Sequence, residues 1–256
     1  MSDRIAAAFA EHGRKAALMP YLMGGFPDLD TSRAVGDACI DAGANLLELG
    51  VPFSDPLADG PVIHEAATRA LAAGATIHGV LRVCESLVAR VPVVLMVYAN
   101  VVLAGGDSGF VERAAAAGAA GLIVPDLPHD EATDLRQVCD EQGVALVPLA
   151  APNTPAQRLE AIGADARGFV YTVSVAGTTG ERNELPPELR ATVQRVKEVA
   201  SVPVAVGFGI STADHARQVA EIADGVIVGS RVVRAAGEGG PDAVAELVAE
   251  LAEALS

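Results

Sequence analysis

The sequence predicts a (β/α)8 barrel, the TIM-barrel architecture, in which eight parallel strands alternate with helices. Eight short apolar runs alternate with longer segments whose apolar residues recur at helical spacing. The runs are apolar on both faces, as is typical of parallel strands covered by helices. Each strand and helix together span about 32 residues, which is enough for right-handed crossovers to a parallel neighbour. We expect one barrel domain over residues 1–256.

The elements follow from the apolar pattern. The predicted strands are 17–23, 45–51, 93–99, 120–126, 144–150, 168–174, 202–208 and 224–230, and the segments between them include helices at 31–44, 110–119 and 213–223. Gly43 and Gly118 follow Ala-rich turns, which suits the end of a helix. Residues before the first strand predict an extra N-terminal helix capped by Ser2 or Asp3. A short helix is expected to begin at Ser230, after the eighth strand.

The alternative fold is an open, doubly wound parallel sheet. That fold places its ligand-binding glycines after the first strand. Here the glycine signals follow strands 6, 7 and 8. Their position favours the barrel.

Composition restricts the partners and the compartment. The formal charge is −15 and the chain has two lysines, Lys15 and Lys197, which argues against binding nucleic acid or an anionic membrane. No apolar run approaches a membrane span, and the N-terminus does not resemble a signal peptide. Three cysteines fall in predicted helices at spacings that fit neither a zinc site nor a redox pair. We therefore expect a soluble cytoplasmic protein with reduced thiols.

In a barrel, functional residues lie at the C-terminal ends of the strands. Glu48 ends a strand between leucines, so burial is expected to raise its pKa and suit it to proton transfer. A structural ion pair would fit this position equally well. Tyr21, Tyr98 and Tyr171 also occupy strand ends, where packing is the alternative role for a tyrosine. Asp126 ends the fourth strand.

Two glycine motifs predict a phosphate site. They are GFGIS at 207–211 and VGSRVV at 228–233. Backbone N–H groups after the last two strands of barrels, together with the start of a short helix, commonly bind phosphate. Gly209, Gly229 and Ser230 are the candidates.

Absent residue types narrow the chemistry. Imine formation needs a lysine at a strand end, but Lys15 precedes the first strand and Lys197 lies in a helix. A metal site would be expected to use histidine, and the strand ends carry none. Acid–base chemistry on a phosphorylated substrate, with no cofactor and no metal, is what remains.

The motif LELGVPFSDPLADGPVI at 47–63 resembles the signature of the tryptophan synthase alpha chain family. The resemblance continues through MVYAN (96–100), VPDLP (124–128), SVAGTTGER (174–182) and GFGIS (207–211). It implies a lyase of tryptophan biosynthesis that cleaves indole-3-glycerol phosphate into indole and glyceraldehyde 3-phosphate. It also implies an alpha2beta2 heterotetramer, in which a beta chain that holds pyridoxal phosphate receives the indole.

The resemblance implies roles for individual residues. Glu48 corresponds to the general acid–base, and Asp59 to the carboxylate that holds the indole N–H. Tyr171 matches an active-site tyrosine. Tyr21 and Tyr98 lie where the family lines its indole pocket, and Thr179 and Gly180 match the mobile loop after strand 6. Gly209, Gly229 and Ser230 match phosphate contacts, and Phe208 is also a substrate-binding position. Asp55 is expected only to shape its loop.

Some positions depart from the common pattern of the family. Met23 and Phe26 stand where many relatives carry threonine and aspartate. Val175 replaces a frequent arginine, Thr178 a common valine and His64 a common glutamine. These differences affect loop closure and ligand contacts. They leave Glu48 and Asp59 in place.

Two other functions fit parts of this pattern. A stand-alone indole-3-glycerol phosphate lyase would share every catalytic residue and need no partner. A non-catalytic barrel could bind a phosphorylated ligand and regulate another protein, but the presence of both Glu48 and Asp59 argues against it. Activation by a beta chain would separate the first from the alpha chain.

Overall fold

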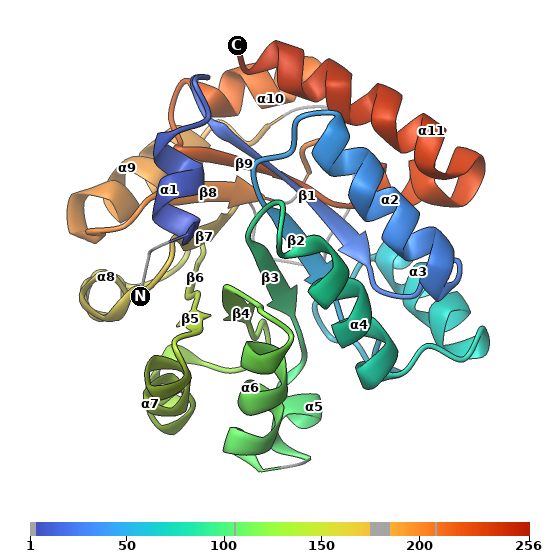
Figure 1. Cartoon of the computed structure of the whole chain (residues 1–256). Coiled ribbons are helices and arrows are strands. Elements are labelled where there is room, and N and C mark those ends of the chain that lie inside the picture. The colour runs from blue at the N-terminus through green and yellow to red at the C-terminus, as the bar shows by residue number, and fades with distance from the viewer. Residues whose placement is uncertain (1–3, 105, 175–184, 208) are drawn as a thin grey trace.

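The computed structural model describes residues 4–104, 106–174, 185–207 and 209–256. All strand pairings are parallel, and the strands follow the order β5-β4-β3-β2-β1-β9-β8-β7-β6 around the centre of the molecule (Figure 1). The strands are β1 Ala17–Met23, β2 Leu47–Gly50, β3 Val93–Met96, β4 Gly121–Ile123, β5 Ala145–Leu146, β6 Leu149–Ala150, β7 Val170–Val173, β8 Val204–Gly207 and β9 Gly225–Val228. The predicted barrel fold is confirmed.

The predicted fifth strand, 144–150, is divided into β5 and β6. Pro148 has no N–H to give to a ladder, so the strand is interrupted there. The Val147 N–H donates to Leu122 O at 2.8 Å on one side, and the Tyr171 N–H donates to Pro148 O at 2.9 Å on the other. The two ends of the sheet are therefore joined through Val147 and Pro148. This join closes the ring.

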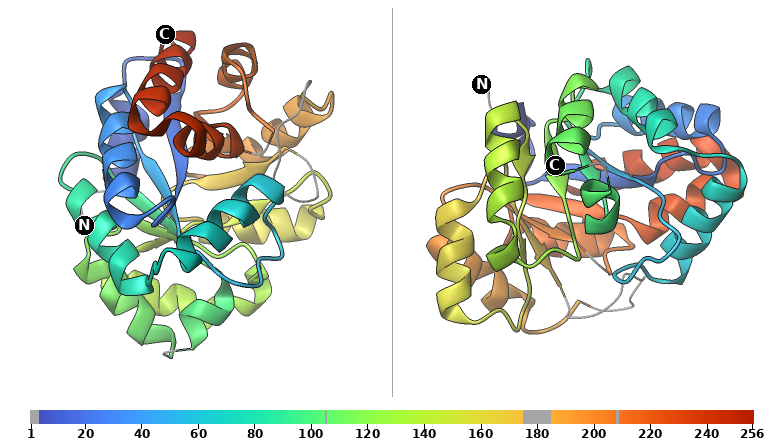
Figure 2. Two further views of the ribbon diagram at one scale, coloured as in Figure 1. Left: turned by 90° about the vertical axis from the view of Figure 1, so that its right-hand side faces the viewer. Right: turned by 90° about the horizontal axis from the view of Figure 1, so that it is seen from below.

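Helices form an outer layer around the ring of strands (Figure 2). They are α1 Arg4–Ala10, α2 Leu29–Asp41, α3 Pro61–Ala72, α4 Ile77–Leu87, α5 Ala99–Leu103, α6 Asp107–Ala116, η1 His129–Glu131, α7 Thr133–Gln142, α8 Ala156–Asp165, α9 Leu189–Val199, α10 Ala213–Ala220 and α11 Ser230–Ala254. The predicted helices at 31–44, 110–119 and 213–223 correspond to α2, α6 and α10. Gly43 and Gly118 have φ of +105° and +79°, a conformation that suits glycine at a helix end.

The extra N-terminal helix closes one end of the barrel. Ile5 of α1 lies against Gly121 and Gly168, and Phe9 lies against Gly225 and Phe169, with 5.6 Å between the two phenyl centroids. These contacts lie at the N-terminal ends of the strands. The predicted caps, Ser2 and Asp3, lie outside the described residues. Because α1 covers this end, access to the barrel is left to the C-terminal ends of the strands.

The helix that begins at Ser230 continues beyond the predicted short helix. Its backbone leaves helical geometry at Gly240 (φ 63°, ψ −152°), and Pro241 follows. The predicted phosphate-binding helix is therefore the first part of α11, before this kink.

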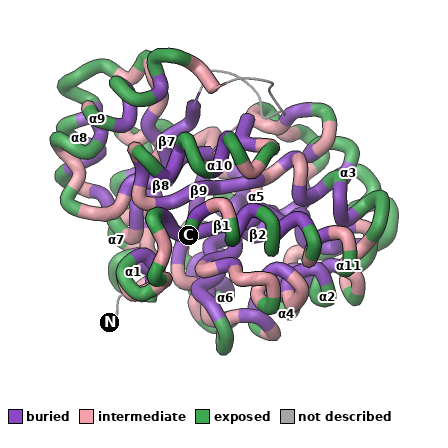
Figure 3. Tube along the Cα trace, turned by 90° about the horizontal axis from the view of Figure 1, so that it is seen from above, coloured by how far each residue is buried: buried purple, intermediate pink, exposed green. Residues whose placement is uncertain are grey.

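Buried residues follow the strands and the inner faces of the helices, whereas exposed residues lie on the outside (Figure 3). Among the described helices, none has both the length and the apolar character that a membrane crossing requires.

Candidate active site

Glu48 is the second residue of β2 (Leu47–Gly50), rather than its last as the sequence predicted, and it is fully buried. It is in register with Tyr21 of β1 and Val94 of β3. Neither carboxyl oxygen has a hydrogen-bond partner among the described residues. Burial, followed by the negative charge of Asp59, raises the pKa of Glu48 to about 8. An arginine or lysine ion pair, the structural alternative, is not formed with any described residue.

Asp59 lies in the loop between β2 and α3 and is half-buried. Burial raises its pKa to about 6, against the opposing effects of a hydrogen bond from Tyr98 and the charge of His64. The Tyr98 hydroxyl also accepts a hydrogen bond from the Ala58 N–H at 3.1 Å. Tyr98 thus connects the end of β3 with the loop that carries Asp59.

The two acids differ in charge at neutral pH. With a pKa of about 6, Asp59 is mostly ionised at pH 7, whereas Glu48, with a pKa of about 8, is mostly protonated. A proton donor therefore lies beside a carboxylate. Pairs of acids whose environments separate their pKa values are typical of acid–base sites.

Two tyrosines extend over glycines of the neighbouring strand. A Cβ atom at Gly50 would lie 2.1 Å from the Tyr21 hydroxyl oxygen, and one at Gly207 would lie 2.2 Å from the Tyr171 hydroxyl oxygen. Both tyrosines are buried. Burial is the main reason that their pKa values are raised well above the ordinary value, and the charge of Glu48 contributes in both. The hydroxyls therefore remain protonated beside Glu48.

The predicted phosphate residues follow the neighbouring strands β8 and β9. Gly209 has φ of +80°, a conformation available to glycine, and Ser230 is the buried first residue of α11. Gly229 is the N-cap of this helix and makes no side-chain cap hydrogen bond. First-turn N–H groups without a side-chain cap suit an anion.

Three predicted site residues, Thr179, Gly180 and Phe208, lie outside the described residues. The departures at Val175 and Thr178 do so as well. The departures at Met23 and Phe26 are described and buried, and the Phe26 ring lies under the Arg69 guanidinium, with 4.8 Å from Cζ to the ring centroid.

Sequence reasoning missed contributors to the environment of Asp59. Phe53 stacks on Tyr98 with 5.4 Å between ring centroids, and the charge of His64 lowers the pKa of Asp59. His64 lies five residues after Asp59, in the first turn of α3. This short separation in the sequence was the only feature that could have indicated a contact between His64 and Asp59. Asp55 is exposed and accepts a hydrogen bond from Ser54 Oγ at 2.5 Å, as expected for a loop-shaping residue.

Within the described part of the chain, no group of three His, Cys, Asp or Glu side chains could hold a metal ion.

Comparisons with known proteins match nearly the whole chain to one family. Residues 7–255 match the model of a family described as tryptophan synthase alpha chain. The chain is 47% identical to the tryptophan synthase alpha chain of Synechococcus elongatus, with 97% of this chain and 94% of the relative covered. It is 42% identical to that of Bacillus cereus, with 90% of each covered.

Solved structures give the same result. A chain of Mycobacterium tuberculosis tryptophan synthase superposes with a TM-score of 0.91 at 40% identity, and 98% of each chain is covered. A chain of the tryptophan synthase a2b2 complex from Pyrococcus furiosus superposes with a TM-score of 0.86 at 38% identity, covering 93% of this chain and 98% of that one.

Proposed function

This chain belongs to the tryptophan synthase alpha chain family, which cleaves indole-3-glycerol phosphate into indole and glyceraldehyde 3-phosphate, and we propose that Glu48 and Asp59 carry out this cleavage. The observation that supports the proposal is the pairing of a buried, mostly protonated Glu48 with a mostly ionised Asp59. The reaction needs these two states together.

Glu48 transfers the protons. Cleavage of the carbon–carbon bond requires a proton on indole C3, which turns this ring carbon into a leaving group. It also requires loss of a proton from the adjacent glycerol hydroxyl, which becomes the carbonyl of the aldehyde product. A carboxyl group with a pKa of about 8 can donate the first proton and, as the resulting carboxylate, accept the second.

Asp59 holds the indole ring N–H. Protonation at C3 places positive charge on the ring nitrogen, so a carboxylate at this position stabilises the transition state more than the substrate. The hydrogen bond from Tyr98 favours the ionised form of Asp59. Tyr21 and Tyr171 border the acids, and we assign Tyr21 and Tyr98 to the indole pocket and Tyr171 to the catalytic group.

The phosphate is bound at Gly209, Gly229 and Ser230. The position of Ser230 at the start of α11 and the positive φ of Gly209 support this assignment. By family resemblance, Thr179 and Gly180 close over the substrate and Phe208 contacts it.

The partner is a tryptophan synthase beta chain, which receives the indole and carries pyridoxal phosphate. The solved a2b2 complex of the Pyrococcus furiosus relative supports assembly with a beta chain, and the indole transfer and the pyridoxal phosphate are implied by family resemblance. Two of the exposed large apolar side chains follow β2 and β3 at the C-terminal end of the barrel, with Leu57 79% and Leu103 51% exposed. They suit a protein contact there. We place the chain in the cytoplasm, where its three free thiols stay reduced.

The deciding experiment measures indole released from indole-3-glycerol phosphate, with and without a beta chain. Glu48→Gln keeps the shape of the side chain and removes its acid, so release is expected to stop while substrate binding persists. Glu65→Gln, at an exposed position of α3, is the matched control. Normal turnover by Glu48→Gln would refute the mechanism, and a rate that a beta chain leaves unchanged would favour a stand-alone lyase.

A further inference from the structure

We propose that Asp126 is a positioning residue for this reaction, which acts through Tyr98 to hold Asp59 in place. This inference rests on the proposed role of Asp59. Asp126 follows β4, and neither the family motif nor the mechanism above gives it a task. Its contacts lead from the outer edge of the site to the carboxylate that binds the indole N–H.

The first contact is with the start of α5. Asp126 Oδ1 accepts a hydrogen bond from the Ala99 N–H at 2.8 Å. Ala99 is the first residue of α5, and the N-cap residue, Tyr98, makes no side-chain cap hydrogen bond. The carboxylate from the neighbouring strand thus supplies the cap that the helix lacks. This bond ties the backbone at Tyr98 to the end of β4.

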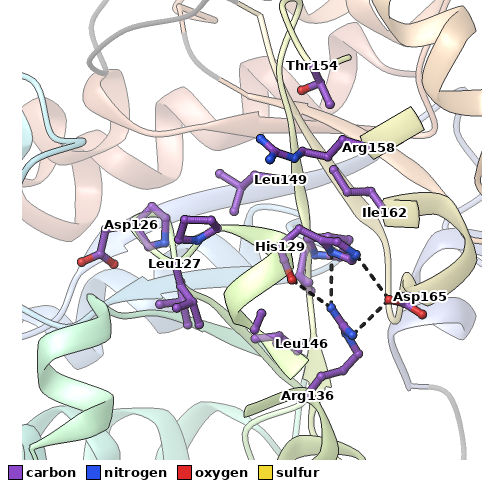
Figure 4. A pocket seen from close by; sticks show the side chains of 16 residues that line it. Asp126, Leu127, His129, Arg136, Leu146, Leu149, Thr154, Arg158, Ile162 and Asp165 are labelled. Carbon is purple, nitrogen blue, oxygen red and sulfur yellow. Dashed lines mark hydrogen bonds and ion pairs between the residues drawn. The ribbon is translucent and has the colours of Figure 1, made fainter. Parts of the chain in front are cut away.

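Asp126 is not engaged by the nearby arginines. It borders a cavity of about 290 Å³ next to α7 and α8, and its carboxylate points away from the cluster of His129, Arg136 and Asp165 (Figure 4). Arg136 pairs with Asp165 at 3.0 Å, and Arg158 pairs with Asp130 at 2.7 Å. No ion pair of Asp126 occurs among the described residues. Its negative charge is therefore directed at α5 and Tyr98.

The second contact runs from Tyr98 to the acid loop. The Tyr98 ring is held by stacking on Phe53, and its hydroxyl accepts the Ala58 N–H and donates to Asp59. Burial, followed by the charge of Asp59, raises the pKa of Tyr98, and the charge of Asp126 makes a smaller contribution, so the phenol keeps the proton that it donates to Asp59. Asp126 thus acts on Asp59 by placing the Tyr98 hydroxyl.

The test uses the full chain without a partner and compares Asp126→Ala with Asp126→Asn. The alanine variant loses the bond to Ala99, so indole release is expected to fall about tenfold or more, since a misplacement of about 1 Å at a reacting centre can cost about a hundredfold. The amide oxygen of asparagine still accepts this hydrogen bond, so Asp126→Asn is expected to recover most of the activity. Asp130→Asn, on the same loop and paired with Arg158, is the matched control and should behave as wild type.

A readout that needs no turnover is the pKa of Asp59, measured by carbon NMR of its carboxyl group. Because the Tyr98 hydrogen bond lowers this pKa, Asp126→Ala and Tyr98→Phe should each raise it, by about 0.5 or more. In the Tyr98→Phe background, Asp126→Ala should change neither the Asp59 pKa nor the rate further. If Asp126→Ala lowers the rate by the same factor with and without Tyr98→Phe, the two residues act independently and the inference is overturned.

Two further results decide the remaining cases. If Asp126→Ala fails to fold, Asp126→Leu takes its place, because leucine keeps the volume of the side chain and removes the acceptor of the Ala99 N–H bond. A loss of indole release that Asp126→Asn does not share supports the inference, and equal release by these two variants refutes it. Asp59→Asn is measured in parallel. Full activity of that variant would refute the role of Asp59 itself, whereas an inactive Asp59→Asn beside a fully active Asp126→Ala would refute only the positioning role of Asp126.

Discussion

The hydroxyl oxygen of Tyr21 occupies the space where a side chain at Gly50 would begin, 2.1 Å from the position of a Cβ atom there. The two residues lie on neighbouring strands, and Tyr21 is in register with Glu48, two positions before Gly50. The glycine thus allows a tyrosine to extend beside the buried acid. The same arrangement recurs between Tyr171 of β7 and Gly207 of β8.

Gly50→Ala is expected to displace the Tyr21 ring, since the ring carbon next to the hydroxyl would also lie at 2.7 Å. Overpacking of this kind costs about 1–3 kcal/mol of stability. Thermal unfolding and indole release should both decline. Gly109→Ala on α6 is the control, because a Cβ there meets only Arg113 Nη1 at 3.7 Å. Equal stability and activity of the two variants would contradict this prediction.

The dependence of kcat/KM on pH is expected to be bell-shaped. Activity rises as Asp59 ionises near pH 6 and falls as Glu48 loses its proton near pH 8. Because the two acids interact, these limbs belong to the pair. Indole release measured between pH 5 and 9.5 checks the profile. A rate that keeps increasing through pH 9 would show that a protonated Glu48 is not required.

Stability should also depend on the protonation of Glu48. Its pKa is raised from an ordinary 4.5 to about 8, so the folded chain binds more protons than the unfolded chain between these values. The contribution of Glu48 to stability is therefore fully present below about pH 4.5 and is lost as pH rises to about 8. Glu48→Gln removes this loss. The free energy of unfolding of the variant, relative to that of wild type, should therefore be higher at pH 8 than at pH 5, as measured by unfolding both proteins at each pH. A difference that does not change with pH would contradict the raised pKa.

The partner contact can be tested at Leu57, which is 79% exposed in the acid-bearing loop. Leu57→Glu places a charge on this surface, so activation by a beta chain should require a higher beta-chain concentration while the rate of the isolated chain changes little. Leu71→Glu, near the C-terminal end of α3, is the control for replacing an exposed leucine by glutamate. Activation that is the same for both variants would place the contact elsewhere.

Phosphate binding can be tested at Ser230. Ser230→Asp introduces a negative charge at the start of α11, where the substrate phosphate is proposed to lie. The KM for indole-3-glycerol phosphate should rise at least about tenfold because like charges repel at a short distance. Inorganic phosphate should also inhibit the variant more weakly than wild type. An unchanged KM would remove Ser230 from the phosphate site.

Much of the fold is determined by local sequence. Apolar runs bounded by glycine and proline are sufficient to place the strands, because burial on both faces requires continuous apolar residues. Gly43 and Gly118 end helices because their φ values suit glycine. The division of the fifth strand at Pro148 was not predicted. Proline is visible in the sequence, but its effect depends on whether a neighbouring strand needs a backbone N–H at that position.

For the candidate site, local sequence was enough to place Glu48 in a buried strand and the glycines after the last two strands. It could not show that Glu48 has no ion pair among the described residues, that Tyr98 reaches across 39 positions to Asp59, or that Asp126 binds the backbone next to Tyr98. The physical reason is that pKa values and hydrogen bonds depend on burial and distance between side chains from different strands, whereas periodicity records only local burial. The roles of all the site residues stay predictions, and Thr179, Gly180 and Phe208 also lie outside the described residues.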